Sequence, residues 1–445
     1  MATTLTPTIV KLNTTVTSAP VASQLQQSGA FVSLGGTTLT TNDYQFVGTL
    51  ADLEAILSGA GNSTELDAMA TTFFAQGSTV GAYVVELGAQ TTADAGVAAL
   101  QTWITNNPDV FYAYLTPASW GDVVDEVGSV TITDGGTGYT AAPTVTFSAP
   151  SSGTTATGTA TISGGVVTGV TITDPGSGYT TTPTVTFSAP NSGTTATGTV
   201  SLVSPLDVLV ADYSSPDSKT YFFITDTSAG SGLYIPNKAA FVFVPSTTAP
   251  STEFGCAAPF YQWLRNDPST SSKLAPMQYR FLYGVTPWSR ANNATTINSI
   301  LSNYSNLALT GSEGGLTSTC LFKGMLGSGE QASGWFGIDW IQIQAKQSLA
   351  AAIINGSNNN PPLLYNETGV KTLAAVAQQI ANNAVTFGCA QSAVISFIPF
   401  STYIAANPND YAAGVYNGLT CTATFAEGFE EITFNLDAVA FAAAA

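Results

Sequence analysis

The stretch "GAYVVELGAQTTADAGVAALQTWITNNPDVFYAYL" (residues 81–115) decides the fold class of this chain. It opens and closes on short apolar runs rich in Val, Tyr and Phe, which is the composition of buried β-strands. The segment between them predicts a helix with Val97, Leu100 and Ile104 on one face. Thr91 and Asp94 stand at capping-box spacing at its start. A strand, a helix and a second strand in this order favour parallel strands with the helix packed across them.

The same texture continues after residue 204. The apolar runs "DVLVA" (residues 207–211), "YFFIT" (residues 221–225) and "AAFVFV" (residues 239–244) are predicted strands of the same sheet. Helical patterns follow at residues 258–266, 293–305, 339–355 and 368–385. The chain then turns to strands at residues 393–400 and 418–425. The fold class expected is therefore a mixed α/β body with an antiparallel β finish.

The last predicted helix has the clearest amphipathic stripe. Its apolar positions follow helical spacing, and Gly388 after its end supplies a stop signal. The stripe consists of Val370, Leu373, Val376, Ile380 and Ala384.

A long internal repeat interrupts the α/β pattern. Residues 130–160 recur as residues 170–200, with six differences between the copies. Each copy predicts three short strands separated by Gly-rich turns, so the pair forms a small all-β module that is almost free of charge. The sequence "DGGTGY" is loosely similar to a calcium turn, but Gly135 is replaced by Pro175 in the second copy, so a plain turn is favoured. The module is expected to be an exposed insertion inside one domain.

Composition excludes several partners. Charged residues make up 9% of the chain, against about 25% in typical soluble domains. The net charge is −18, which argues against a nucleic-acid backbone or an anionic membrane as a partner, because both need clustered Lys and Arg. So little charge favours a surface largely covered by neighbouring subunits, with a neutral polar surface as the alternative.

Catalytic, metal and cofactor sites are not predicted. The chain has no histidine, which removes Ser-His and Cys-His dyads and His-ligated metal sites. The carboxylate groups "DVVDE" (residues 122–126) and "EGFEE" (residues 427–431) are interpreted as solvating turns or protecting a strand edge. We therefore expect no enzyme activity, no metal and no cofactor.

The cysteines and the N-terminus indicate production in a cytoplasm. Cys256, Cys320, Cys389 and Cys421 are widely spaced, so buried free thiols are expected rather than disulfides. The first residues lack the pattern of a secretory signal, and no stretch approaches the about 20 apolar residues of a membrane span.

Both ends of the chain predict detached strands. "TIVKLNTTVTSAP" (residues 8–20) alternates in period two and precedes the first compact stretch. "EEITFNLDAVAFAAAA" (residues 430–445) alternates Ile432, Phe434 and Leu436 with polar residues just before the chain stops. Such arms can each add a strand to the sheet of a neighbouring copy. The alternative is that both arms fold back onto their own domain.

The segment order resembles a known family. The leading "SQLQQSGAFVSLGGTTLTTNDYQFVGTLADLEAIL" (residues 23–57), the α/β unit, the insertion and the terminal "FEEITFNLDA" (residues 429–438) together are similar to the sheath protein of a contractile phage tail, in a divergent branch long catalogued without a function. The resemblance implies subunits stacked helically as hexameric rings around a tail tube, with arms donated to the sheets of neighbours. It places Ile9, Val10 and Leu12 in the shared sheet together with Ile432, Phe434 and Leu436.

The resemblance also implies a mechanism and partners. Contraction would move subunits largely as rigid bodies, with hinge motion in linkers such as residues 17–27, and would drive the tube through the host envelope. The partners implied are copies of the chain itself, the tail tube protein, and the baseplate and tail terminator proteins. The location implied is the tail of a virion assembled in the host cytoplasm.

Two other functions stay open. In the first, the repeat module is a carbohydrate-binding platform on a virion or outside a cell, with Tyr139 and Tyr179 as surface contacts; packing between strands is the alternative role for these tyrosines. In the second, the chain is the tail tube itself, although tube subunits are usually smaller and mainly β.

These observations divide the chain into six parts. They are an N-terminal arm (residues 1–22), a first core part (23–126), the inserted β module (127–203), a second core part (204–366), a C-terminal α/β domain (367–428) and a C-terminal arm (429–445).

Overall fold

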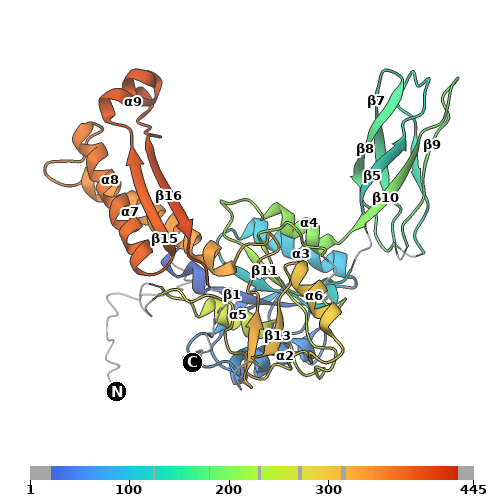
Figure 1. The fold of residues 1–445 in the computed structure, drawn as a ribbon, viewed down its shortest axis with the longest axis horizontal. Helices are drawn as coiled ribbons and strands as arrows, with labels where there is room; N and C mark the ends of the chain where they lie inside the picture. Colours follow the sequence, from blue (N-terminus) through green and yellow to red (C-terminus); the bar gives the residue numbers. More distant parts are fainter. Residues whose placement is uncertain are drawn as a thin grey trace, which may run out of the picture.

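The computed structural model describes residues 22–123, 126–151, 153–179, 181–228, 232–268, 273–311 and 317–428. Both predicted arm strands, with Ile9, Val10, Leu12, Ile432, Phe434 and Leu436, lie outside the described residues. Within the described residues, three parts stand out: a central α/β core, a β module on one side of it and a helical unit with two strands on the other (Figure 1). None of the described helices combines the length and apolar character needed to cross a bilayer.

A six-stranded sheet forms the centre of the core. Its strand order is β12-β11-β4-β1-β3-β2, with all neighbours parallel except β2 and β3, which are antiparallel. The strands are β1 (Gly29–Ser33), β2 (Tyr44–Val47), β3 (Ala82–Glu86), β4 (Ala113–Leu115), β11 (Tyr221–Thr225) and β12 (Ala240–Phe243). The predicted strand-helix-strand unit is confirmed, and β1 lies between its two strands.

Helices cover both faces of this core sheet. The one face packs against α2 (Ser63–Phe74) and α5 (Ala257–Leu264), and the other against α3 (Ala93–Asn106) and α4 (Pro205–Asp212). Because both faces are buried, β1, β11 and β12 are buried along their whole length, which explains their unbroken apolar sequences. The core also contains three short helical elements, η1 (Ala22–Gln27), α1 (Leu50–Glu54) and η2 (Ala118–Trp120).

Two predictions in this region are wrong. Residues 207–211, predicted as a strand, lie in helix α4, which starts with Pro205 in its first turn and buries Leu206, Leu209 and Val210 against the sheet. A short apolar run fits a strand and a buried helix equally well, and Pro at the first helical position was the signal overlooked. The cap of α3 is Thr92 rather than Thr91: the Thr92 hydroxyl accepts from the Ala95 N–H.

Next to the core sheet, α6 (Ala294–Ser302) covers a hairpin of β13 (Leu307–Thr310) and β14 (Thr319–Phe322). The thiols of Cys256, Cys320 and Cys389 are free and buried, whereas Cys421 is free and exposed, contrary to the expectation that all four are buried.

The repeat module is a pair of interlocked repeats. Its strands are β5 (Glu126–Asp134), β6 (Val145–Phe147), β7 (Thr157–Ser163), β8 (Val166–Asp174), β9 (Val185–Phe187) and β10 (Thr197–Val203). Strand β5 of the first copy pairs with β10 of the second, and β6 pairs with β9. Strands β7 and β8 form the connecting hairpin, whose turn residues Gly164 and Gly165 both have positive φ.

The two tyrosines proposed as surface contacts of the module are buried. Tyr139 is 6% exposed and Tyr179 is 2% exposed. The Tyr139 hydroxyl accepts from the Ala196 N–H of the other copy, at 2.9 Å, and the Tyr179 hydroxyl accepts from the Ala156 N–H at 2.8 Å. These rings therefore tie the two copies together and are not available to stack on a sugar.

The module enters and leaves the core at adjacent points. Glu126, the first residue of β5, pairs with Val203, the last residue of β10. Paired residues of antiparallel strands have Cα atoms about 5 Å apart. A very short connection could therefore join the two ends of the core chain that flank the module.

Replacing residues 127–202 with Gly-Gly is expected to leave the core folded, because the two cut ends already lie side by side. The measurement is thermal unfolding followed by circular dichroism, with the helical signal per molecule unchanged. A matched replacement of residues 205–225, which removes α4 and β11, should abolish folding. A module-free chain that fails to fold would show that the module is an integral part of the core.

Candidate functional site

The C-terminal unit carries a two-stranded antiparallel sheet. This unit consists of α7 (Ala332–Ser357), α8 (Glu367–Thr386), β15 (Ala390–Phe397), α9 (Phe400–Ala406), α10 (Pro408–Ala413) and β16 (Leu419–Phe425). Strands β15 and β16, called here the terminal ribbon, pair with each other from Ala390–Phe425 to Phe397–Leu419. The helices and strands were predicted, but α9 and α10 between the two strands were not.

The terminal ribbon has one covered face. Ala393 and Ala423, which are paired across the ribbon, pack towards the helices. The small hydrophobic cluster beneath them contains Trp340, Ile341, Ile380, Ala384, Cys389 and Ala390. The opposite face is open: Val394 is 62% exposed, and its partner Thr422 is exposed too. The ribbon is therefore held in place from one side and open on the other.

Both outer edges of the terminal ribbon are open among the described strands, because β15 pairs only with β16. In an antiparallel strand, every second residue then points its N–H and C=O outwards without a strand partner. Natural edges are usually blunted by charged residues or Pro. Neither "AQSAVISF" nor "LTCTATF" contains a charged residue or a Pro. This composition is suited to pairing with further strands on either side.

Glycines in α7 let the ribbon dock closely. A Cβ on Gly337 would lie 2.0 Å from the carbonyl oxygen of Cys389, immediately before β15. A Cβ on Gly334 would lie 3.2 Å from the ring of Phe425 at the end of β16. The Phe425 ring also packs against Trp335, with ring centroids 5.4 Å apart. The two glycines thus set how the ribbon sits on the helix.

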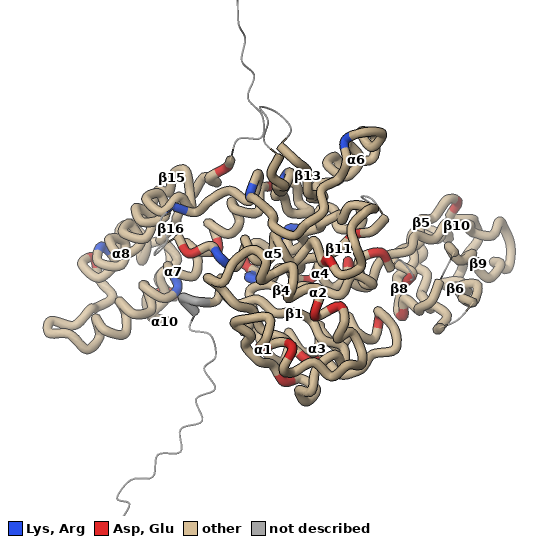
Figure 2. Tube along the Cα trace, turned by 90° about the horizontal axis from the view of Figure 1, so that it is seen from below, with Lys and Arg blue, Asp and Glu red and all other residues tan. Residues whose placement is uncertain are grey.

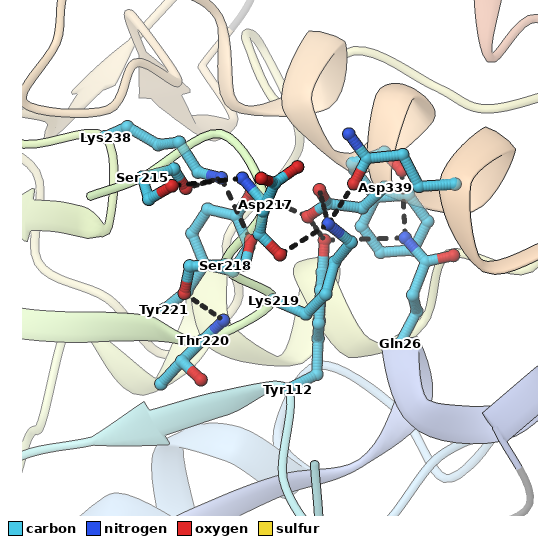
Figure 3. A network of polar contacts seen from close by, with 12 residues as sticks. Gln26, Tyr112, Ser215, Asp217, Ser218, Lys219, Thr220, Tyr221, Lys238 and Asp339 are labelled. Atoms are coloured by element: carbon cyan, nitrogen blue, oxygen red, sulfur yellow. Dashed lines mark hydrogen bonds and ion pairs between the residues drawn. The ribbon is translucent and has the colours of Figure 1, made fainter. Parts of the chain in front are cut away.

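A buried polar network joins α7 to the core sheet (Figure 3). Asp339 of α7 is fully buried, and its Oδ2 accepts from the hydroxyls of Tyr112 and Tyr221, at 2.8 and 2.7 Å. Tyr221 lies in β11 and Tyr112 immediately precedes β4. Lys219 Nζ lies 3.4 Å from Oδ1 of Asp339. The carboxylate therefore connects the C-terminal unit to the centre of the core sheet.

The network extends to the start of the described chain. Gln26 in η1 donates to the carbonyl of Phe336 in α7, at 2.9 Å, and to the Tyr112 hydroxyl. Leu25 is 5% exposed. The described part of the predicted hinge at residues 17–27 is therefore the helix η1, which is anchored on the core through Leu25 and Gln26.

Burial controls the proton affinities in the network. Loss of water raises the pKa of Asp339, while Lys219, Lys238 and the two tyrosine hydroxyls act in the opposite direction. Burial, followed by the charge of Asp339, holds the pKa values of Tyr112 and Tyr221 well above their ordinary range, so both hydroxyls remain donors. Burial lowers the pKa of Lys238, whose Nζ lies 4.4 Å from the ring centre of Trp335.

This network was not predicted from the sequence. The hydrogen bonds that Gln26 and Asp339 form in it join residues 86 to 310 positions apart, so no local motif links them. One signal was present: Asp339 is the only charged residue in "GWFGIDWIQI" (residues 334–343), and a lone carboxylate in an apolar helix needs buried partners.

The described residues do not gather ligands for a metal. No group of three or more His, Cys, Asp or Glu side chains within them could hold a metal ion. Asp122 is bound instead by Thr227, whose N–H and hydroxyl both donate to its carboxylate.

Comparison with known proteins identifies the fold. No family model matches the sequence, and no curated protein matches it. One similar structure is a chain from the 6-fold symmetrised baseplate of the anti-feeding prophage. The alignment spans 98% of the present chain and 99% of the baseplate chain, with 9% identity and a TM-score of 0.54. A chain of the helical sheath of the same prophage in the contracted state shows equal coverage, at 10% identity and a TM-score of 0.52.

A third chain, from the anti-feeding prophage baseplate in the contracted state, has 12% identity and a TM-score of 0.50. The alignment with this baseplate chain again spans 98% of the present protein. The protein therefore has the mixed α/β fold of these chains from the baseplate and helical sheath of the anti-feeding prophage, which agrees with the fold that the resemblance in its sequence predicted.

The Gly337→Ala variant tests how the ribbon docks. The added methyl would collide with the Cys389 carbonyl oxygen. We expect a net loss of about 1–3 kcal/mol in the free energy of unfolding, because the overpacking outweighs the about 1 kcal/mol by which Ala favours a helix over Gly. Urea unfolding followed by tryptophan fluorescence measures the change. The control is Gly169→Ala in β8, where a Cβ meets nothing within 4 Å. Equal stability of the two variants would contradict close docking.

The Tyr221→Phe variant tests the buried network. It removes one hydroxyl donor from Asp339, and hydrogen bonds to charged groups contribute about 1.5–3 kcal/mol. The free energy of unfolding should fall by that amount in denaturant titrations. Tyr283→Phe, at a ring that is 57% exposed, should change it by less than about 0.5 kcal/mol. A loss no larger than that of the control would mean that the network does not hold α7 on the core.

Proposed function

We propose that this protein is the structural subunit of a contractile tail sheath, which polymerises around a tail tube by exchanging terminal strands. One observation carries the proposal: among the described strands, the terminal ribbon is a two-stranded sheet whose outer edges have no partner and no charged residue, and it lies at one end of the molecule (Figure 1). The sequences at both ends of the chain supply candidate strands to fill such edges. Ile9, Val10 and Leu12 belong to one of them, and Ile432, Phe434 and Leu436 to the other.

Strand addition suits a subunit that must stay connected while it moves. Main-chain hydrogen bonds give the joint its strength, and alternating side chains fix its register. The open face around Val394 can receive the apolar positions of an added strand. In this proposal each copy accepts one arm on each edge of its ribbon, and its own arms enter the ribbons of two neighbours.

The arrangement of the three parts supports a radial order in the assembly. The repeat module and the C-terminal unit lie on opposite sides of the core (Figure 1). If the module points outwards, the terminal ribbon lies at the inner radius, near the tube. Contraction then moves each core and its ribbon as one body, while the interfaces between copies change. Work of this kind needs no catalytic chemistry.

The proposal names partners in the tail. Copies of the chain supply the strands, the tube lies inside the sheath, and a baseplate and a terminator protein limit its two ends. The anti-feeding prophage structures, which come from a baseplate and a helical sheath, support this assignment by their fold.

Truncation tests the proposed strand exchange. The full-length chain should form tubes visible by negative-stain electron microscopy, and a chain ending at Gly428 should form none, because it lacks the donated strand. A chain ending at Asp437, which keeps that strand, is the matched control and should assemble. Indistinguishable tubes from the chains ending at Gly428 and at full length would reject the proposal.

The truncated chain should also act as a cap. It keeps both edges of its ribbon but has no C-terminal strand to donate, so it can join a growing end without allowing normal extension. Adding it in small amounts to the full-length chain should shorten the tubes. Unchanged tube length, with the truncated chain still folded by circular dichroism, would contradict donation of the C-terminal arm.

A further inference from the structure

A basic groove lies where the described chain ends. It has a volume of about 810 Å³, and Arg265, Lys273 and Arg280 are among the residues that line it, together with Pro276. The whole chain has ten Lys and Arg residues, so this groove collects a large share of its positive charge. Among the described residues that line it, Asp267 is the one carboxylate. The groove is therefore a site of positive charge on a strongly acidic protein.

The charge of the protein is unevenly distributed. Residues 22–218 contain no Lys or Arg at all. Figure 2 shows the consequence: Lys and Arg occur on the side of α5, α6, α7 and α8, while the repeat module and the region of α1 to α3 show only acidic residues. An acidic segment close to the groove has few other positive surfaces to bind.

Arg280 is a fixed part of the groove wall. Its guanidinium donates to the carbonyls of Ala275 and Pro276, each at 2.9 Å, and to the side chains of Gln262 and Asn266. Burial and the nearby charge of Arg265 lower the pKa of Arg280 to about 10. The wall thus holds two like charges close together.

The other two cations are exposed. Among the described residues, neither Arg265 nor Lys273 forms an ion pair with a carboxylate. Their positive charges are available to an anionic segment, which would also relieve the repulsion between Arg265 and Arg280.

The last described residue lies against this groove. The Gly428 N–H donates to the Gln331 side-chain oxygen at 2.8 Å, and the Gln331 amide donates back to the Gly428 carbonyl at 3.1 Å. A Cβ on Gly428 would lie 2.8 Å from Cβ of Pro276, the residue whose carbonyl binds Arg280. The backbone leaves the described region at a fixed point beside the cations.

The next residues of the sequence are Phe429, Glu430 and Glu431. Two residues of extended chain span at most about 7 Å, so the Glu430 backbone stays close to Pro276 whichever direction the chain takes. We propose that Glu430 and Glu431 bind in the groove of their own chain, as a latch that pairs their carboxylates with Arg265 and Lys273. The occupant is the root of the C-terminal arm.

The latch deepens the proposed function, and its biological role rests on that function. It fixes where the arm begins and leaves Ile432, Phe434 and Leu436 free to continue into a neighbouring ribbon. Pre-orienting the arm lowers the entropy lost when its strand is donated. The latch itself needs no neighbour.

Zero-length carbodiimide coupling tests this inference on the full-length chain. The reagent joins a Lys amine directly to a carboxylate in contact with it, and mass spectrometry identifies the joined peptides. Dilute monomer should yield about tenfold more coupling of Glu430 or Glu431 to Lys273 than to Lys346, an exposed lysine of α7 outside the groove. Coupling to Lys273 no greater than to Lys346 would overturn the latch.

Isotope mixing separates the two possible origins of the glutamates. In a mixture of ¹⁴N- and ¹⁵N-labelled chains, a latch within one chain gives peptide pairs that are all light or all heavy. Mixed pairs as the main product would show that the groove binds another copy, and would overturn the inference. Because the measurement uses monomer, it does not depend on whether tubes form, so failure of the latch and failure of strand exchange are distinguishable.

Variants of Arg265 provide a second check. Arg265→Glu should reduce coupling between Lys273 and Glu430 or Glu431 several-fold, because it places a negative charge in the groove. Arg265→Lys keeps the charge and should retain most of the coupling. Equal yields from these two variants, with both chains folded by circular dichroism, would contradict an electrostatic latch.

Discussion

The fully buried carboxylate of Asp339 is the contact on which the arrangement of the molecule depends. It is the point where the helix that carries the terminal ribbon meets the core sheet, through the hydroxyls of Tyr112 and Tyr221. A buried charge is tolerated only when it is paired and hydrogen-bonded, and removing one partner is costly. The C-terminal unit therefore cannot tilt on the core without exposing or isolating this group. Directional bonds of this kind specify one orientation where apolar packing alone would allow several.

The fixed position of the terminal ribbon on the core matters for the proposed function. A strand bound to a ribbon on a flexible tether would transmit little force, whereas a ribbon fixed to the core moves with it. The proposed strand exchange would also account for the unprotected edges of the ribbon. Added strands would fill these edges, and charged residues there would oppose the pairing. The scarcity of charge in the whole chain is consistent with surfaces that neighbours cover.

Much of the fold was predictable because its signals are local. Apolar runs identified β3, β11 and β12, and helical periodicity identified α3 and α8, with Gly388 at positive φ after the end of α8. The repeat was visible directly, and its strands lie where each copy predicted them. The failures have physical causes. Residues 207–211 form too short an apolar run to distinguish strand from helix, and Tyr139 could not be placed without knowing that the copies interlock.

The candidate site could be predicted only in part. Its helices and strands are indicated by neighbouring residues in the sequence, whereas its contacts join residues that are far apart in the sequence. The strands of the terminal ribbon were predicted close to their observed positions, but the Asp339 network joins residues more than one hundred positions apart, and no spacing in the sequence indicates it. The basic groove is similar: Arg265, Lys273 and Arg280 look like scattered charges in sequence, and only the fold places Gly428 beside them.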